Sequence, residues 1–271
     1  MPELPEVETT RRGLAPYLHG NRIARIIVRQ PSLRWPIPDE IISLRQQPVL
    51  DWQRRAKYLL LQTPPGIIIS HLGMSGSMRV TTPESDWRLH DHVEWQLVDG
   101  QAVRFHDPRR FGCMLWQPSA TDTPHPLLAR LGPEPLSDDF DGDWLWQHAR
   151  GRRSAVKSHI MDAGIVVGVG NIYAAEALFA AGIHPQRAAG RVSRQRYQRL
   201  AEEIKNVLAA AIDMGGTTLR DFSGSGGEPG YFVQNLKVYG RDGKLCRHCA
   251  SIIKNRRIGQ RSSYYCPRCQ R

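Results

Sequence analysis

Residues 246–269 read CRHCASIIKNRRIGQRSSYYCPRC, and they hold two Cys-x2-Cys pairs with sixteen residues between them. Each pair can hold one edge of a tetrahedral ion from a tight turn, and a hairpin between the pairs would bring all four thiolates together. This spacing predicts one structural Zn²⁺, because four protein ligands leave no coordination position for water. The predicted ligands are Cys246, Cys249, Cys266 and Cys269. His248 lies between two of them and could replace one, but a histidine in this position is more often a surface residue.

The chain around this motif is strongly basic. The whole sequence has 37 Lys and Arg against 26 Asp and Glu, a net charge of +11, and residues 235–271 contain ten basic residues and one acid. A cation-rich soluble surface would explain the total. The concentration of charge in one tail instead favours a polyanionic partner such as nucleic acid, whose neutralised phosphates release counterions. A basic zinc hairpin beside other folded modules therefore indicates a nucleic-acid-binding protein.

The composition excludes several other classes of protein. A chain of 271 residues, 41% of them hydrophobic, is long enough for one to two domains with a real core. No run of about 18 apolar residues is present, which argues against a transmembrane helix. The first residues, MPELPEVETT, lack the basic and apolar segments of a secretory signal. We therefore expect a cytoplasmic protein without a membrane partner, in which Cys113 is a small core residue.

The N-terminal half reads as a helix followed by strands. Residues 3–19 have apolar positions at helical spacing, with a proline in the first turn and Gly20 as a stop. Residues 22–29 and 49–62 are strand-like runs. Residues 92–98 alternate, with Val93, Trp95 and Leu97 on one face, and Asp99-Gly100 predicts a hairpin that returns through 102–106. We expect mostly antiparallel strands in a sandwich or barrel up to residue 132.

The composition then changes, and the second half reads as helical. Residues 133–143 are rich in Pro, Asp and Gly and indicate a linker. Helices are predicted from about residue 144, over 173–181 and over 194–214, the last with Ser193 as N-cap and Gly215 as its stop. Residues 223–230 contain four glycines and predict a flexible segment before the cysteine-bearing tail.

Several short motifs give the chain a family resemblance. They are PELPE at 2–6, RAKY at 55–58, HLGMSG at 71–76, DPRRFG at 107–112 and GVGNIY at 168–173. Together with the zinc hairpin, and in this order, they make the chain resemble the formamidopyrimidine-DNA glycosylases, bacterial enzymes that excise oxidised purines. The resemblance covers nearly the full length.

The resemblance implies an α+β multidomain protein. The implied parts are an N-terminal β-sandwich with an N-terminal helix over 1–132, a linker over 133–143, a helix-two-turn-helix domain over 144–234 and a zinc finger over 235–271. Double-stranded DNA would lie in the groove between the two main domains. Residues 223–230 match the loop that closes over the flipped base in this family.

The implied chemistry begins at the second residue. A proline after Met1 permits removal of the initiator methionine, which would leave Pro2 with a free secondary amine that can attack sugar C1′ and form an iminium. The resemblance assigns proton transfer at the sugar to Glu3, phosphate contact and help in elimination to Lys57, and the second elimination to Arg261. Without the family, Pro2 would be a weak signal and Glu3 an ordinary N-terminal helix acid. Glu6 is such an acid or holds the helix end.

A glycosylase must take its base out of the stack and fill the hole. Met74, Arg109 and Phe111 match the residues that this family inserts: an apolar plug, a hydrogen-bonding partner for the orphaned cytosine, and a wedge between base pairs. Further implied contacts are with the DNA backbone. They come from His90, Arg152, Asn171 and Tyr239. Asn171 begins a helix after Gly168-x-Gly170, where exposed N–H groups suit a phosphate or a plain N-cap.

Two alternatives accompany this hypothesis. An endonuclease VIII-type enzyme for oxidised pyrimidines shares the proline, glutamate, lysine and zinc finger, but it does not typically share PELPE or the inserted trio. A non-catalytic damaged-DNA-binding module would bind lesions without a covalent intermediate. The leading expectation is a bifunctional base-excision repair enzyme, a glycosylase and AP lyase acting by β,δ-elimination, which works as a monomer on duplex DNA.

Overall fold

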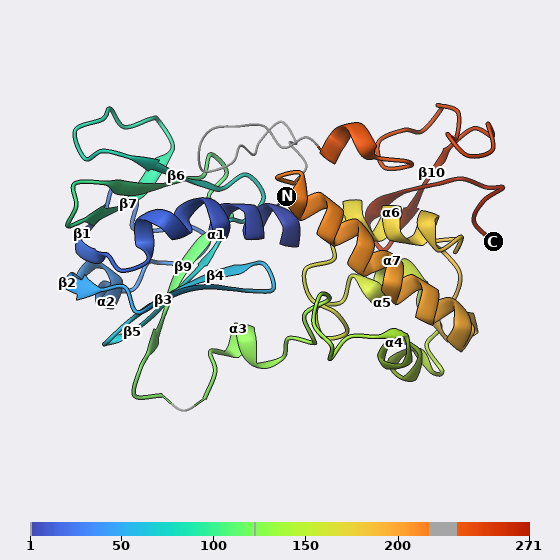
Figure 1. The fold of residues 1–271 in the computed structure, drawn as a ribbon, viewed down its shortest axis with the longest axis horizontal. Helices are drawn as coiled ribbons and strands as arrows, with labels where there is room; N and C mark the ends of the chain where they lie inside the picture. Colours follow the sequence, from blue (N-terminus) through green and yellow to red (C-terminus); the bar gives the residue numbers. More distant parts are fainter. Residues whose placement is uncertain (1, 122, 217–231) are drawn as a thin grey trace. The chain divides into compact units, whose positions relative to one another are not determined.

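The computed structural model describes residues 2–121, 123–216 and 232–271. It divides into two compact units (Figure 1), one spanning Met1–Ala129 and Met214–Tyr231 and the other spanning Arg130–Asp213 and Phe232–Arg271. The predicted flexible segment over 223–230 lies outside the described residues. Within the described part of the chain, no helix is long and apolar enough to cross a membrane.

The first unit opens with the predicted N-terminal helix, α1 (Leu4–Leu18). Pro5 lies in its first turn, where a missing backbone N–H costs nothing. Gly20 has a φ of 73°, a left-handed conformation that ends a helix readily only at glycine. Val7, Leu14 and Leu18 are buried and join the core of the unit. The helix is therefore held by its apolar stripe.

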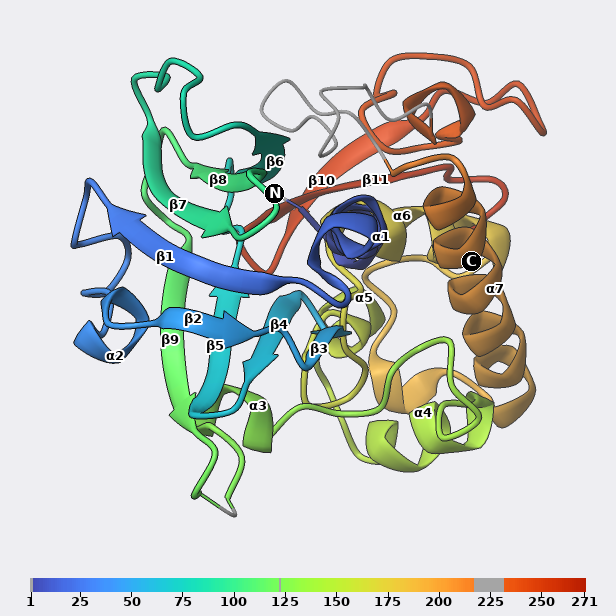
Figure 2. The same cartoon turned by 60° about the vertical axis from the view of Figure 1, so that its left-hand side comes forward.

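Two antiparallel sheets pack against each other in this unit (Figure 2), which confirms the sandwich. Their inner faces meet where the rings of Trp52 and Trp95 form an edge contact with centroids 6.1 Å apart. The five-stranded sheet has the order β2-β1-β7-β8-β6, with β1 (Arg22–Val28), β2 (Arg45–Pro48), β6 (Ser77–Thr81), β7 (Asp91–Leu97) and β8 (Ala102–His106). The four-stranded sheet has the order β3-β4-β5-β9, with β3 (Asp51–Arg55), β4 (Tyr58–Thr63), β5 (Gly66–His71) and β9 (Cys113–Pro118). Two short helices accompany them, α2 (Asp39–Ile42) and α3 (Pro126–Ala129).

Residues 49–62 differ from the sequence prediction of one extended run. They form a hairpin, in which β3 turns into β4 through Ala56 and Lys57. Ala56 has a φ of 55°, a left-handed conformation that alanine disfavours. Glycine or asparagine would normally occupy such a position, and their absence here explains why the sequence did not predict the turn. The turn holds Lys57 at the end of two paired strands.

The hairpin of β7 and β8 forms as predicted, but both faces of β7 are buried. Its polar face carries Glu94, which forms a fully buried ion pair with Arg104 of β8. Gln96 continues the network by donating to Glu94 and accepting from Arg25. Alternation of apolar and polar residues indicates which face lies in the core and cannot show that the other face is covered as well.

The second unit is helical and ends in a small hairpin. Its helices are α4 (Gly142–Ala149), α5 (Val156–Ile160), α6 (Asn171–Ala180) and α7 (Arg194–Asp213), with 3-10 turns η1 (Ala189–Arg191) and η2 (Phe232–Asn235). The hairpin pairs β10 (Lys254–Ile258) with β11 (Arg261–Tyr265). Ser193 Oγ accepts the backbone N–H of Arg196 at 3.4 Å, and Gly215 has a φ of 73°, so both predicted ends of α7 are confirmed.

Candidate functional site

The N-terminus of α1 holds the predicted nucleophile and its neighbour. Pro2 and Glu3 are both buried, Glu3 with only 2% of its surface exposed. The backbone N–H of Glu3 donates to Glu6 Oε2 at 2.7 Å, and Glu6 is equally buried. Glu6 therefore holds the helix end, one of the two roles expected for it. This bond fixes the backbone on which the residue before Glu3 is placed.

A second acid ties α1 to the turn that carries Lys57. Glu8 accepts hydrogen bonds from Arg11, Arg12 and Arg54. Burial would raise the pKa of Glu8, but these three guanidinium groups lower it to about 2. Arg54 also donates to the carbonyl of Ala56 at 2.9 Å. The helix of Pro2 and the turn of Lys57 are thus joined through one buried carboxylate.

His71 connects the Lys57 turn to the loop that carries Met74. Its Nδ1 accepts the backbone N–H of Gly73 at 2.9 Å. Burial, followed by the positive charges of Lys57 and Arg34, lowers the pKa of His71 to about 4. The imidazole is neutral near pH 7, the state in which Nδ1 can accept a hydrogen bond from an amide N–H.

Buried Asp107 joins the two loops whose motifs are HLGMSG and DPRRFG. Its Oδ1 accepts from the hydroxyl of Ser75 at 2.9 Å, and its Oδ2 accepts the backbone N–H of Gly112 at 2.7 Å. Gly73 has a φ of 66°, and a side-chain carbon there would lie 2.4 Å from the backbone of Phe111. Glycine is needed at this position both for its conformation and for the close approach of the two loops.

The predicted inserted residues are brought together by these contacts. The guanidinium of Arg109 lies 4.8 Å from the ring centre of Phe111, and 45% of the Phe111 surface is exposed. Met74 follows Gly73 on the adjacent loop and is half-buried. A large apolar ring held at a surface turn beside a cation is suited to contact with a flat, stacked partner.

In the second unit, the ammonium group of Lys157 links three elements through hydrogen bonds. Its Nζ donates to Asn171 Oδ1 at 2.6 Å, to Ser263 Oγ at 2.8 Å and to the carbonyl of Ser262 at 3.1 Å. Lys157 lies on α5 and is 1% exposed, Asn171 is the first residue of α6, and the serines belong to β11. The predicted phosphate ligand is therefore oriented by a buried cation.

Two further predicted residues lie near this cluster. Arg261 adjoins it in the sequence, and Tyr239 contacts the same strand in space. Arg261 is exposed at the start of β11, directly before Ser262. The ring of Tyr239 lies 5.0 Å from that of Tyr264 on the same strand. Buried Glu176 of α6 accepts the backbone N–H groups of residues 237–239, which anchors Tyr239. Arg152 follows α4 and bonds the His148 carbonyl at 3.3 Å, and none of the contacts described for the chain joins it to the others.

The four predicted zinc ligands converge in the second unit. All four sulfur atoms lie within 4.8 Å of one another, with Cys249 and Cys266 3.4 Å apart and Cys246 and Cys269 4.0 Å apart. Zn–S bonds of about 2.3 Å in a tetrahedron require sulfur separations of about 3.8 Å, so the set fits Zn²⁺. His248 Nδ1 lies beside Cys269 Sγ at 3.4 Å and is not needed as a ligand.

Cys113 lies outside the zinc set, in the first unit. It is 2% exposed, and burial raises the pKa of its thiol to about 11. The expectation that Cys113 is a small core residue is confirmed. A raised pKa keeps the thiol protonated near pH 7, whereas the thiolate is the reactive form.

Comparison with family models and relatives decides the family. Residues 1–114 match the formamidopyrimidine-DNA glycosylase N-terminal domain, residues 131–223 the H2TH domain of the same enzymes, and residues 243–271 the zinc finger found in FPG and IleRS. The chain is 58% identical over its full length, and over the full length of each relative, to formamidopyrimidine-DNA glycosylases of Pseudomonas aeruginosa and Alcanivorax borkumensis. The chain belongs to the formamidopyrimidine-DNA glycosylase family.

Solved structures of formamidopyrimidine-DNA glycosylases have the same fold. A Lactococcus lactis FPG mutant in complex with Fapy-dG-containing DNA matches with a TM-score of 0.92, 31% identity and full coverage of both chains. The MutM (FPG) protein of Thermus thermophilus matches with a TM-score of 0.89 and 35% identity over 99% of this chain and 98% of its own. The predicted α+β fold, with its helix, sandwich, helical domain and zinc finger, is thereby confirmed.

The sequence predictions did not include three buried residues that hold the elements on which the predicted functional residues lie. Glu8, Asp107 and Lys157 are buried polar residues, each bonded to an element that carries a predicted functional residue. A short polar residue in a loop or a single lysine in a helix carries no periodic signal that it is buried. Only the position of Asp107 at the head of DPRRFG offered a hint.

Proposed function

We propose that this chain is a bifunctional DNA glycosylase and AP lyase of base-excision repair that acts on oxidised purines, 8-oxoguanine and formamidopyrimidines, in duplex DNA. One observation carries the proposal in addition to the family. Glu3 is buried at the start of α1, beside Pro2, with its own N–H held by Glu6. A nucleophile and a proton-transfer group are thus adjacent on a fixed backbone, at a position where the α-amine is available once Met1 is removed.

The chemistry follows from the amine. The neutral Pro2 nitrogen attacks sugar C1′ as the bond from C1′ to the base breaks, and the proton that the nitrogen loses balances the proton that the departing base takes up. Glu3 delivers the proton that opens the sugar ring, which gives an iminium between Pro2 and C1′. The iminium acidifies the C2′ proton, so the 3′ phosphate leaves by β-elimination. We assign phosphate contact at this step to Lys57 and the δ-elimination of the 5′ phosphate to Arg261.

The remaining residues bind and hold the opened duplex. We assign the filling of the vacated stack to Met74 and Phe111, and the pairing of the orphaned cytosine to Arg109. Backbone phosphates are assigned to His90, Arg152, Asn171 and Tyr239. Asn171 begins α6, whose N-terminal N–H groups favour an anion, and Lys157 adds a positive charge beneath it. The four-cysteine zinc supports the hairpin that presents Arg261.

Oxidised pyrimidines are a second candidate substrate class, favoured by one observation. A wild-type Lactococcus lactis FPG that matches this chain with a TM-score of 0.90 and 31% identity was solved with an oxidised-pyrimidine-containing DNA. The complete inserted trio of Met74, Arg109 and Phe111 makes purines the preferred class here. The proposed setting is a monomer on DNA in the bacterial cytoplasm, without a membrane partner.

Borohydride trapping tests the function directly, because borohydride reduces an iminium to a stable amine. The purified protein is mixed with a duplex carrying 8-oxoguanine opposite cytosine, reduced, and mapped by mass spectrometry. A rapid cross-link on Pro2 is expected, and a parallel duplex with an oxidised pyrimidine should react more slowly. A faster adduct with the pyrimidine would support the endonuclease VIII-type alternative. Tight binding with no adduct, despite a free Pro2, would make the chain a damage-binding module.

Glu3→Gln gives a matched test of the proton-transfer role. The variant keeps the size of the side chain and should bind lesion DNA with the affinity of the unmodified protein. Excision should fall by roughly 10²-fold or more, the usual contribution of a positioned acid or base. Single-turnover excision and fluorescence anisotropy measure the two quantities. An unchanged excision rate would remove Glu3 from the mechanism.

A further inference from the structure

A pocket of about 360 Å³ lies in the first unit, beside the turn that carries Arg109 and Phe111. Its walls include Arg29, Leu89, His90, Asp91, Pro108 and Arg110. Three chain segments therefore meet there: the residue after β1, the segment before β7, and the DPRRFG turn. Among these residues, only His90 has a role in the function proposed above.

The pocket offers two arginines that no acid neutralises. Arg29 and Arg110 are exposed, and neither forms an ion pair with any of the residues that the structure describes. The guanidinium of Arg29 lies 4.9 Å from the ring centre of Trp87. Stacking on the ring restrains the guanidinium and leaves the N–H donors at its edge free for an oxygen ligand.

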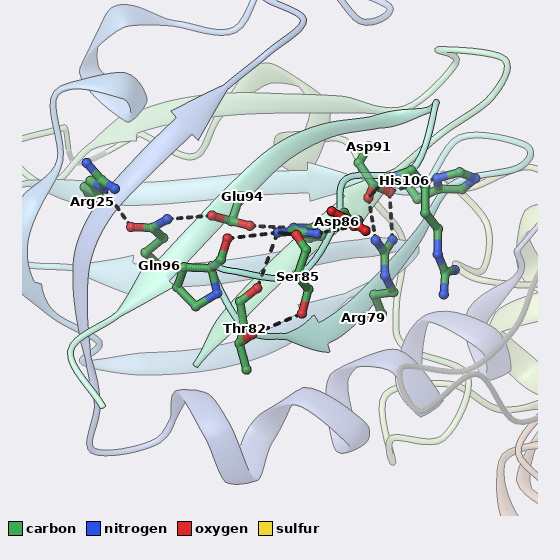
Figure 3. Close-up of polar contacts among 12 residues, drawn as sticks. Arg25, Arg79, Thr82, Ser85, Asp86, Asp91, Glu94, Gln96 and His106 are labelled. Atoms are coloured by element: carbon green, nitrogen blue, oxygen red, sulfur yellow. Dashed lines mark hydrogen bonds and ion pairs between the residues drawn. The ribbon is translucent and has the colours of Figure 1, made fainter. Parts of the chain in front are cut away.

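The acid in the pocket wall, Asp91, already accepts hydrogen bonds from residues other than the two pocket arginines (Figure 3). It accepts from both terminal nitrogens of Arg79, from His106 Nδ1 at 3.0 Å and from the backbone N–H of Arg88 at 2.8 Å. Burial would raise the pKa of Asp91, but hydrogen bonds from Arg79, Arg88 and His106 lower it to about 2. Its charge is balanced by Arg79, so the pocket has a net positive charge.

The segment that leads to His90 is held in place before any ligand arrives. The buried guanidinium of Arg104 donates to the carbonyls of Ser85 at 2.7 Å and Asp86 at 2.8 Å. Arg104 also lies 4.5 Å from the ring centre of Trp87, the ring on which Arg29 stacks. The carbonyl of His90 accepts from the backbone N–H of Asp107 at 3.0 Å. The ring on which Arg29 stacks and the backbone of His90 are therefore preorganised, while Arg110 is placed by its backbone on the DPRRFG turn.

We infer that this pocket binds one backbone phosphate of the DNA, with part of its deoxyribose, through Arg29 and Arg110. Arg110 adjoins Arg109 on the same turn, so the site continues the surface of the inserted residues and rests on the function proposed above. A guanidinium pair matches the charge and the paired oxygens of a phosphodiester. Leu89, 86% exposed at the rim, supplies an apolar surface for the sugar.

A methylphosphonate scan tests the site. Each phosphate in turn of a duplex with a stable abasic analogue opposite cytosine is replaced by a neutral methylphosphonate, and the dissociation constant is measured by fluorescence anisotropy. In the unmodified protein, a methylphosphonate at one linkage near the inserted residues should weaken DNA binding several-fold. The same substitution should lower the magnitude of the slope of log K against log[salt] by about 0.9. An Arg29→Gln/Arg110→Gln variant should bind the unmodified duplex as weakly as the unmodified protein binds the duplex with that methylphosphonate. In this variant, a methylphosphonate at the same linkage should not weaken binding further.

Arg22→Gln is the matched control. Arg22 begins the strand that Arg29 follows, about 23 Å away at about 3.3 Å per residue, and it should keep the full response at every linkage. The proposal is overturned if the double variant keeps the response of the unmodified protein at all linkages, or if Arg22→Gln abolishes the same one. Borohydride trapping at saturating protein separates the two proposals, because the double variant should still trap on Pro2. Absence of trapping in the unmodified protein would instead contradict the proposed function.

Discussion

Lys157 shows how much one residue can organise in this protein. An ammonium group has three N–H donors, and Lys157 directs them to acceptors on α6 and β11 while 1% of its surface is exposed. A buried lysine is costly unless its charge is well solvated by partners. Here the partners include Asn171, so we infer that Lys157 positions the side chain that is proposed to contact the DNA.

We expect Lys157→Met to lower excision by about tenfold or more while leaving the zinc in place. Asn171 loses the bond that orients it, and buried acceptors on β11 lose their donor, which costs about 1–3 kcal/mol for each unsatisfied group. The measurements are single-turnover excision at saturating protein and zinc content. Lys205→Met is the matched control, because Lys205 in the same unit donates to the carbonyl of Ser137 and lies 6.0 Å from the ring centre of Phe140, and neither contact involves Asn171 or β11. An unchanged excision rate in Lys157→Met would remove the positioning role.

At the scale of elements, the loops over 71–76 and 107–112 form one assembly. Asp107 bonds both of them, and Gly73 lets their backbones touch. The residues proposed to enter the DNA therefore sit on loops with a shared buried support. Loops generally tolerate change, but these two are constrained by a carboxylate that is 0% exposed.

Substitution of Asp107 should separate charge from hydrogen bonding. In Asp107→Asn, the amide oxygen can accept from Gly112 and the amide nitrogen can donate to Ser75 Oγ, so both contacts survive. Asp107→Ala leaves the Gly112 N–H buried and unpaired, and we expect a loss of about 1–3 kcal/mol of stability. The readout is the ratio of excision opposite cytosine to excision opposite adenine, which should fall in the alanine variant alone. Equal ratios in all three proteins would contradict the shared support.

Removal of zinc should unfold the zinc finger and also disturb the helical domain that packs against it. Cys246 and Cys266 pack with Val238 and Ile253 around α6, and this small core needs the metal to close it. Chelation should unfold the hairpin, release Ser262 and Ser263 from Lys157, and abolish DNA binding, which added Zn²⁺ should restore. Thiol titration gives the count: four cysteines should become reactive on chelation, while Cys113 should not. Full DNA binding by zinc-free protein would contradict this prediction.

At the scale of the whole molecule, stability should depend on pH in two stages. The folded state holds the pKa of His71 at about 4, below its ordinary value of 6.5, so the unfolded chain binds more protons between these values. Stability is therefore lost as pH falls from about 6.5 to about 4, by on the order of 3 kcal/mol. Glu8 and Asp91 have pKa values of about 2, and their contribution is lost only as pH falls from about 4.5 to about 2.

Urea unfolding at pH 7.5, 6, 5 and 4 tests the first stage. The free energy of unfolding should decline across this range in the unmodified protein and decline less in His71→Asn, whose amide oxygen can replace Nδ1 as the acceptor for Gly73. An identical decline in both proteins would assign the loss to other groups.

Elements with a clear hydrophobic periodicity or a characteristic residue spacing could be predicted from the sequence. The zinc ligands, α1, α7 and the hairpin of β7 and β8 were all predicted within a few residues of their observed bounds. The hairpin at Ala56 was missed because a left-handed alanine leaves no signal in composition. The supports at Glu8, Asp107 and Lys157 were missed because a buried polar residue is defined by partners far along the chain. Pairings over long sequence separation follow from packing, which a local pattern does not contain.

Two of the four zinc thiolates, those of Cys249 and Cys269, are partly open to solvent. Peroxides and related oxidants attack accessible thiolates, and oxidised sulfur no longer binds zinc. The same oxidants produce the damaged purines that this enzyme is proposed to remove. Oxidative stress would then raise the number of lesions and, at the same time, release the metal that supports the hairpin whose Ser262 and Ser263 bond Lys157. The reducing power of the cell would set the repair capacity of this protein as well as the rate at which its substrate forms.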